Sequence, residues 1–204
     1  MKRLLRILLG TCVLTLLLAA GASAGEPTDQ VRQSVDKVLN ILRNKELKRP
    51  ERTQERRAAI RKIVDERFDF EDMAKRSLAL HWRKRTPEEK KEFVMLYSDL
   101  LERAYIKKIE NYTDEKVLYT GESVEGDYAV VRTKIVRKGV ETPIDYRLLR
   151  KNTQWEVYDV IIEGVSLVNN YRKQFNQIIN SRSYEELVRR LKSKKADEEF
   201  EAPK

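Results

Sequence analysis

The chain has 204 residues, of which 41% are hydrophobic and 37% charged, and its formal net charge is +9 at pH 7. This length is enough for one globular domain with a sizeable core. The single cysteine and single histidine exclude a disulfide framework and leave too few ligands for a Cys/His metal centre. Lysine and arginine alternate with acidic residues along most of the chain, which is typical of a solvated surface and argues against a nucleic-acid-binding protein.

Residues 1–24 have the three parts of a secretory signal peptide: a basic start, the apolar run 7–20 and the small residues 22–24. We predict cleavage after Ala24 and export of the mature protein. Cleavage removes Cys12 and lowers the net charge to +6, because this segment holds three basic and no acidic residues. The alternative is a transmembrane anchor, which needs about 20 apolar residues, and this run is shorter.

Apolar residues then recur at helical spacing. Residues 27–44 predict an amphipathic helix with one apolar side, formed by Val31, Val35, Val38, Leu39 and Leu42. A second helix is expected from about Thr53 to Phe68, and Asp69 can cap a third that leads to Trp82.

The longest helical pattern covers residues 86–112. Thr86-Pro87-Glu88-Glu89 is a capping-box signature with proline at the first helical position. One face of this helix is apolar and aromatic, and the opposite face is charged, so we expect the rest of the domain to pack around it.

From residue 117 the spacing changes to alternation, and four strands are predicted at 117–122, 128–137, 142–150 and 155–162. Tight turns between them indicate an antiparallel meander with one apolar face. A fifth helix capped by Ser166 and a short sixth one after Ser183 follow. The fold class is therefore α+β, with about six helices over about four strands. A single domain is expected over 25–192, with a charged, disordered tail at 193–204.

The sequence offers few catalytic constellations. Glycines are scattered at turns, and His81 is the sole histidine. Asp159 alternates with apolar residues on the fourth strand, so it is either a hydrogen-bonded structural carboxylate or an acid–base residue with a raised pKa. The pattern favours a binding protein over an enzyme and implies no metal and no cofactor.

Segments along nearly the whole mature chain resemble the MlaC family, the periplasmic phospholipid-binding proteins of the Mla (toluene-tolerance) ABC lipid transport system. Among them are Phe70-Glu71-Asp72-Met73-Ala74, the run 78–89 with His81-Trp82-Arg83, Tyr146-Arg147-Leu148, the run 155–168 followed by Asn170-Tyr171-Arg172, and the run 183–191. One departure is Ala79, which stands where a glycine is expected before the Trp-Arg pair.

The resemblance implies an NTF2-like curved antiparallel sheet whose helices enclose an apolar pocket. It also implies a periplasmic carrier that takes a phospholipid as cargo between two partners. These are an inner-membrane ABC transporter complex with an MCE-domain subunit and an outer-membrane lipoprotein complex. A monomer is expected.

The apolar faces and the resemblance together suggest which side chains contact lipid. The candidates on the helices preceding the sheet are Trp82, Phe93, Leu96, Tyr97, Leu100, Leu101 and Tyr105. Those on the strands are Val131, Ile135, Tyr146, Leu148 and Val157, and those on the fifth helix are Val168, Tyr171 and Phe175. Arg83 and Arg172 are candidates for a headgroup phosphate. Each apolar candidate could equally fill a core.

Two other functional classes stay open from the sequence. The same fold could be a ligand-free adaptor of an ABC transporter, which would have a filled interior. It could also be an NTF2-like hydrolase or isomerase, which would need Asp159 inside the cavity.

Overall fold

The computed structural model describes residues 25–112, 115–200 and 202. It confirms the α+β class. The helices are α1 (Glu26–Arg43), α2 (Thr53–Arg67), α3 (Phe70–Leu78), α4 (Pro87–Glu110), α5 (Leu167–Ser181), α6 (Tyr184–Leu191) and α7 (Ala196–Glu199). Two 3-10 turns, η1 (Pro50–Arg52) and η2 (Ala79–Lys84), precede α2 and α4. The predicted signal peptide lies outside the described residues. Within those residues, no helix combines the length and the apolar character needed to span a membrane.

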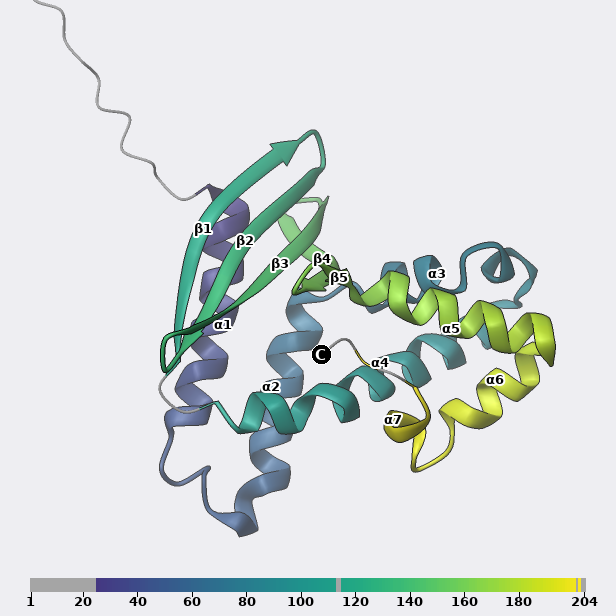
Figure 1. The fold of residues 1–204 in the computed structure, drawn as a ribbon, viewed down its shortest axis with the longest axis horizontal. Helices are drawn as coiled ribbons and strands as arrows, with labels where there is room; N and C mark the ends of the chain where they lie inside the picture. Colours follow the sequence, from purple (N-terminus) through teal and green to yellow (C-terminus); the bar gives the residue numbers. More distant parts are fainter. Residues whose placement is uncertain (1–24, 113–114, 201, 203–204) are drawn as a thin grey trace, which may run out of the picture.

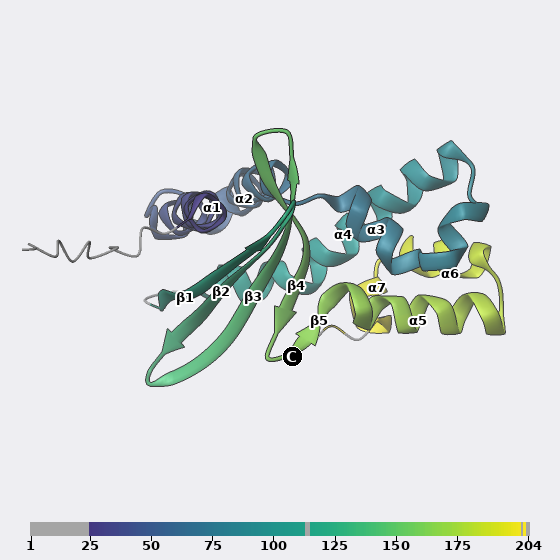
Figure 2. The same cartoon turned by 90° about the horizontal axis from the view of Figure 1, so that it is seen from above.

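The sheet is an antiparallel meander in chain order. Its strands are β1 (Lys116–Glu125), β2 (Tyr128–Arg137), β3 (Val140–Lys151), β4 (Gln154–Ile162) and β5 (Val165–Ser166). The four predicted strands are present, and β5 is an addition too short for alternation to reveal. Register shifts at Tyr119/Gly121 and at Arg147/Leu148 mark bulges, which increase local twist. Figure 2 shows the resulting curvature.

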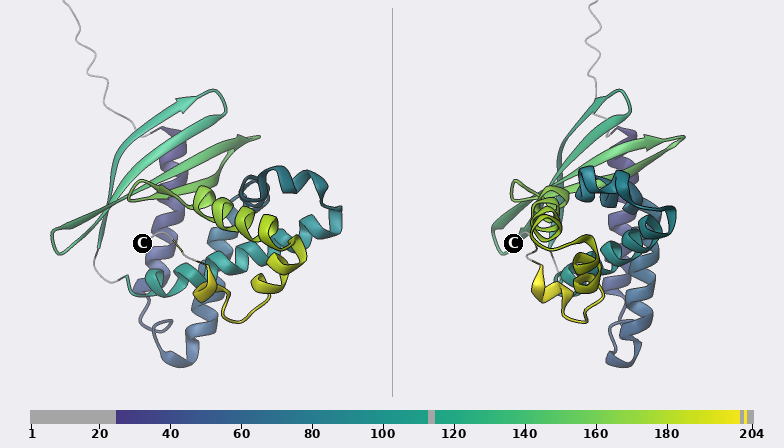
Figure 3. Two further views of the ribbon diagram at one scale, coloured as in Figure 1. Left: turned by 45° about the vertical axis from the view of Figure 1, so that its right-hand side comes forward. Right: turned by 90° about the vertical axis from the view of Figure 1, so that its right-hand side faces the viewer.

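The helices form two groups around this sheet. The antiparallel pair α1 and α2 lies over one face of the sheet, whereas α3, α5, α6 and α7 gather beyond the β4–β5 edge (Figures 1 and 2). Helix α4 runs between the groups: its N-terminal half lies with α5 and α6 and its C-terminal end reaches toward α1 (Figure 3). The long helix therefore joins a helical unit to a helix-covered sheet.

The start of α1 is fixed to the edge strand β1. The Glu122 carboxylate accepts hydrogen bonds from the Thr28 backbone N–H at 2.7 Å and from the Thr28 hydroxyl at 2.6 Å. An anionic group at a helix N-terminus satisfies free N–H groups and complements the helix dipole. This contact, 94 residues apart in sequence, orients α1 across the sheet.

Helix α4 begins as predicted. The Thr86 hydroxyl accepts a hydrogen bond from the Glu89 N–H at 3.2 Å, and the Glu89 carboxylate accepts one from the Thr86 N–H at 2.8 Å. The helix ends at Glu110, two residues before the predicted end.

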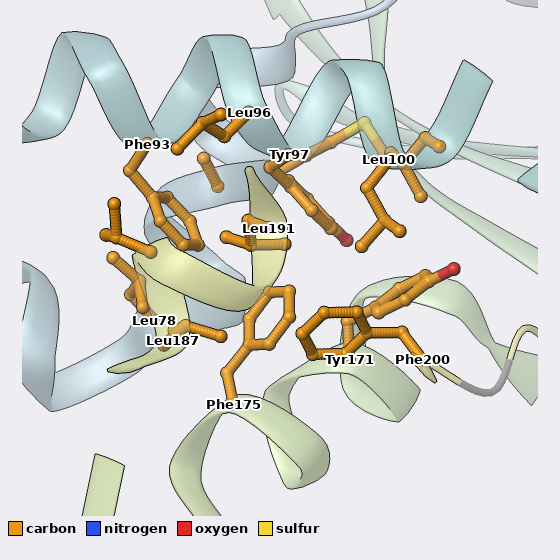
Figure 4. Close-up of a cluster of buried hydrophobic side chains, with 14 of the residues drawn as sticks. Leu78, Phe93, Leu96, Tyr97, Leu100, Tyr171, Phe175, Leu187, Leu191 and Phe200 are labelled. Atoms are coloured by element: carbon orange, nitrogen blue, oxygen red, sulfur yellow. The ribbon is translucent and has the colours of Figure 1, made fainter. Parts of the chain in front are cut away.

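The helical unit has a filled core of aromatic and aliphatic side chains, which Figure 4 shows. The ring of Phe175 meets those of Phe93 and Tyr97 at centroid distances of 5.6 Å, and Tyr97 meets Tyr171 at 5.5 Å. All four rings are fully buried. Edge-to-face aromatic packing of this kind stabilises a core beyond the area that it buries.

Residues 193–200, which the sequence predicts to be disordered, are ordered and packed against the helical core. Ala196 starts the short helix α7, and Phe200 is 2% exposed, with its ring 5.5 Å from that of Phe175. The composition of this segment is charged, so sequence reasoning missed that one aromatic side chain is enough to dock it on the helical core.

Candidate functional site

A cavity of about 800 Å³ lies between α1, α2, the last turns of α4 and the sheet. The helices, with the residues just after α2 and α4, supply most of its apolar wall: Val31, Val35, Val38, Leu39, Leu42, Ile60, Ile63, Val64, Phe68, Tyr105, Ile109 and Tyr112. The strands add Val117, Ile135, Val140, Ile144, Tyr146, Val157 and Ile162. This volume is toward the upper end of the range of small-molecule sites, roughly 300–1,000 Å³.

The wall forms because α1 and α2 turn their apolar stripes toward the sheet. On α1, the residues at steps of three and four from Val31 to Leu42 all face the cavity. On the sheet, Val117 pairs with Ile135, and Ile144 pairs with Ile162, so the cross-strand neighbours share the same face.

Many of these wall residues are only half-buried although they are large and apolar. Val35, Val38, Leu39, Ile144 and Tyr146 all retain exposed surface. A residue in a filled core has no such surface, as Phe93 and Phe175 show. The side chains of the wall therefore enclose space that a further apolar group could occupy.

A smaller pocket of about 210 Å³ continues the cavity between α2 and α4. The two pockets share eight wall residues: Ile60, Val64, Phe68, Tyr105, Ile109, Ile144, Tyr146 and Ile162. They are two parts of one apolar chamber.

Arg67 is a buried charge in the wall, 8% exposed at the end of α2. Its guanidinium donates to the Trp155 carbonyl at 2.6 Å, to the Gln30 side-chain oxygen at 2.8 Å and to the Ser34 hydroxyl at 3.0 Å. Burial lowers the pKa of Arg67. Because N–H groups of its guanidinium are hydrogen-bonded to α1 and β4, Arg67 links α2 to both of these elements of the wall.

Two tyrosines give the chamber polar tips. Burial raises the pKa of Tyr146 to about 12, and it also raises the pKa of Tyr105. The Tyr105 hydroxyl is buried and has no hydrogen-bond partner among the described residues. Both phenols are therefore neutral at physiological pH, and the interior stays uncharged at these positions.

Comparison with known proteins places this chain in a family. The model of the MlaC protein family matches residues 32–193, which is most of the chain. The chain belongs to the MlaC family. The match covers all four cavity-forming parts: α1 from its second turn, α2, α4 and the sheet.

Two relatives of this MlaC protein are informative. It is 23% identical over 189 residues to the intermembrane phospholipid transport system binding protein MlaC of Haemophilus influenzae, covering 89% of this chain and 88% of the other. Its fold matches a phospholipid-binding protein of Ralstonia solanacearum, solved in complex with a phospholipid, with a TM-score of 0.75 and 24% identity. That alignment covers 86% of this chain and 99% of the other.

Some of the residues predicted to contact lipid line the chamber of this MlaC protein. Tyr105, Ile135, Tyr146 and Val157 line its larger part, and Leu101 lines its smaller part. Val131 and Leu148 lie in the core of the sheet, fully buried.

The remaining apolar candidates lie in the helical core, apart from the chamber: Trp82, Phe93, Leu96, Tyr97, Leu100, Val168, Tyr171 and Phe175. Sequence periodicity marks a face as apolar without saying whether it meets a filled core or a hollow one. The aromatic half of α4 packs into the filled core.

Neither arginine predicted for a headgroup lines the chamber. Arg83 is exposed on η2, and the Arg172 guanidinium donates to the carbonyl of Arg76 at 2.9 Å. Arg172 thus joins α5 to α3.

The wall residues on α1 and α2 were missed as site residues, although both helices were predicted. On α1, the sequence pattern that marks them is the stripe from Val31 to Leu42, composed of valine and leucine with no aromatic residue. The aromatic residues of α4 and α5, by contrast, fill the core of the helical unit.

Asp159 has a structural role. Its carboxylate accepts hydrogen bonds from the Ser166 hydroxyl at 2.7 Å and from the Val168 N–H at 3.0 Å. It thereby holds the first turn of α5, and it is not among the residues that line the chamber.

Proposed function

We propose that this protein is a phospholipid carrier that encloses the acyl chains of its cargo in the chamber between α1, α2, α4 and the sheet. The observation that carries the proposal is a cavity of about 800 Å³ with a wall of aliphatic and aromatic side chains. The family membership and the phospholipid transport function named for the Haemophilus influenzae relative support it.

The energetics explain why such a carrier needs an enclosed chamber. At about 0.8 kcal/mol per CH₂, exposing two chains of roughly sixteen carbons to water costs on the order of 25 kcal/mol. A surface groove leaves much of that area wet. The half-buried residues of the wall provide the apolar surface that replaces the bilayer.

The proposed setting is the periplasm, reached through the signal peptide and cleavage after Ala24. The carrier would act as a monomer between an inner-membrane ABC transporter complex with an MCE-domain subunit and an outer-membrane lipoprotein complex. The three-part N-terminal pattern and the intermembrane function named for the relative support this setting.

The two alternative classes fit the structure less well. An adaptor without ligand predicts a filled interior, and the open chamber argues against it. An enzyme using Asp159 needs that carboxylate in the cavity, and its hydrogen bonds hold α5 instead.

The test is native mass spectrometry with lipid extraction on protein purified from a bacterial periplasm. We expect co-purified phospholipid near one molecule per protein. Lipid-free protein that also fails to take lipid from vesicles would contradict the carrier function.

Variants locate the cargo. Val38→Glu and Ile109→Glu place a charge against the acyl chains, which costs several kcal/mol, so bound lipid should fall at least about tenfold. The matched control is Val124→Glu on the edge strand β1, where the valine is 51% exposed and outside the wall. Unchanged lipid in folded Val38→Glu protein would refute this chamber as the site.

A further inference from the structure

Arg67 is a buried cation whose charge is not neutralised within the wall of the chamber. It is 8% exposed, and it forms no ion pair with a carboxylate in the described part of the chain, whereas Arg56 and Arg57 on the same helix both reach Glu110. Burial outweighs the attraction of two more distant carboxylates and lowers the pKa of Arg67. A buried charge without a counter-ion is costly, so an anionic ligand at this position is favoured.

The guanidinium of Arg67 also keeps two hydrogen-bond donors free. An arginine side chain has five N–H groups, one on Nε and two on each of Nη1 and Nη2. The Nε donates to the Ser34 hydroxyl at 3.0 Å, and Nη1 donates to the Gln30 side-chain oxygen at 2.8 Å and the Trp155 carbonyl at 2.6 Å. Nη2 has no acceptor among the residues that the structure describes. A ligand oxygen can therefore bind Nη2 while the contacts to α1 and β4 stay in place.

This polar group is part of the surface of the chamber. Arg67 and its hydrogen-bond partner Ser34 both line the larger part of the chamber, together with Val31 and Val157. The two valines are 2% and 0% exposed, so the protein covers this end of the chamber. In such surroundings a hydrogen bond between charged groups is stronger than in water.

The open end of the chamber is far from Arg67. Phe68, the next residue, forms a bridge to Val157, and the strand register places Val157 level with Ala129 on β2. The exposed lining residue Arg137 lies eight residues further along β2, roughly 26 Å at about 3.3 Å per residue. One layer of acyl chains spans about 15 Å, half of the hydrocarbon core of a bilayer. A single chain held at Arg67 therefore fits within the length of the chamber.

We propose that the chamber also binds a long-chain carboxylate, such as a free fatty acid, with its carboxylate on the Nη2 of Arg67 and its tail directed toward the open end. A carboxylate supplies the negative charge that Arg67 lacks and matches the planar guanidinium. This activity goes beyond phospholipid carriage, because the polar end of the ligand lies at the covered end of the chamber. It rests on the same chamber that the proposed function uses.

The experiment compares single-chain lipids that differ only at the polar end. Delipidated protein is incubated with equimolar hexadecanoic acid and hexadecan-1-ol at pH 8, and native mass spectrometry gives the ratio bound. We expect the wild type to prefer the acid about fivefold or more, as a hydrogen bond between charged groups allows. Methyl hexadecanoate keeps the carbonyl and lacks the charge, so it should bind like the alcohol.

Two variants and a control assign the preference to Arg67. Gln30→Glu keeps the shape of the side chain and places a carboxylate beside Nη1, so it should neutralise Arg67 and remove the preference while the alcohol still binds. Arg67→Gln should remove the preference by loss of the cation. The control is Arg103→Gln, because the half-buried Arg103 donates to the Leu191 carbonyl outside the chamber and its loss should keep the preference.

The possible outcomes separate this inference from the carrier function. A folded Gln30→Glu protein with the wild-type preference would overturn the proposal, and so would equal binding of acid and alcohol by the wild type. Methyl ester bound as well as the acid would assign Arg67 to an ester carbonyl and overturn the carboxylate role. Uptake of phospholipid from vesicles without binding of hexadecanoic acid would overturn this inference and leave the carrier function standing.

Discussion

Ala79 ends α3 in a backbone conformation that glycine adopts easily and alanine does not. Its φ is +49° and its ψ is −119°. The Cβ of an L-residue is crowded in this region, at a cost of about 1–3 kcal/mol. A glycine was expected at this position from the resemblance of the sequence, and the geometry supplies the physical reason. The turn at η2 is kept by its surroundings despite the strain.

Ala79→Gly should therefore stabilise the protein by up to about 1 kcal/mol, since relief of strain exceeds the greater freedom of the unfolded chain. The measurement is chemical denaturation of both proteins. The control is Ala58→Gly at an exposed position inside α2, where glycine should cost about 1 kcal/mol. Equal destabilisation by both substitutions would show that residue 79 carries no strain.

At the scale of elements, α2 is tied to α4 by a carboxylate held between two arginines. The side chain of Glu110 is 10% exposed and lies 2.8 Å from the guanidinium of Arg56 and 2.7 Å from that of Arg57. The hydrogen bond from Arg57 is the largest cause that lowers the pKa of Glu110, and burial of the carboxylate acts in the opposite direction. This contact holds α2 against the C-terminal end of α4, and both helices line the chamber.

Glu110→Gln should destabilise the protein by about 2 kcal/mol at pH 7, because two partly buried arginines lose their anion. The folded-state pKa of Glu110 is lowered, so its contribution is present above the unfolded value of about 4.5 and is lost as pH falls below it. Unfolding curves from pH 7 to 3 should show a smaller acid loss for the variant.

The control for this prediction is an exposed pair. Glu46 lies 3.0 Å from Arg49, and both side chains are more than half exposed. Glu46→Gln should change stability by less than about 1 kcal/mol, with the acid dependence of the wild type. If Glu110→Gln behaves in the same way, the α2–α4 tie is no stronger than a surface ion pair.

At the scale of the whole molecule, the filled core and the chamber belong to different parts of the chain. Phe93, Tyr97 and Phe175 are fully buried between α4 and α5, whereas α1 and α2 face open space. The half-buried side chains of the chamber wall make fewer packing contacts than the side chains of a filled core. We expect the α1–α2 wall to open more readily than the helical unit when no lipid is bound.

Hydrogen exchange read by mass spectrometry tests this expectation. Loading delipidated protein with phospholipid should slow exchange in α1 and α2, while α5 and α6 change little, because a ligand stabilises the elements that it contacts. Slowing of equal size in every helix would indicate a single cooperative unit instead. The Val38→Glu variant should show no slowing when it is mixed with the same vesicles.

Much of this architecture could be predicted because it depends on local signals. The Thr86 cap, the Ser166 cap and the alternation of β2 and β3 each act within a few residues and define elements correctly. Whether an apolar face meets a partner or a void depends on contacts such as Thr28 to Glu122, which no local pattern encodes. That is why the sequence predicts lipid contact for Tyr97 and Phe175 and not for Val38, whereas the structure places Val38 in the chamber wall and the two aromatic rings in the filled core.

The separation of the filled core from the chamber also bears on how the cargo could diversify. A substitution at Val35, Leu39 or Ile144 changes the shape of the hollow without touching the aromatic packing around Phe175. The loss of folding stability is then limited to the few contacts of the substituted side chain. Exchanging aliphatic residues on α1 and β3, in nature or by design, can therefore adapt the chamber to longer, shorter or bulkier hydrocarbon chains. The core of the helical unit stays unchanged and keeps the protein folded.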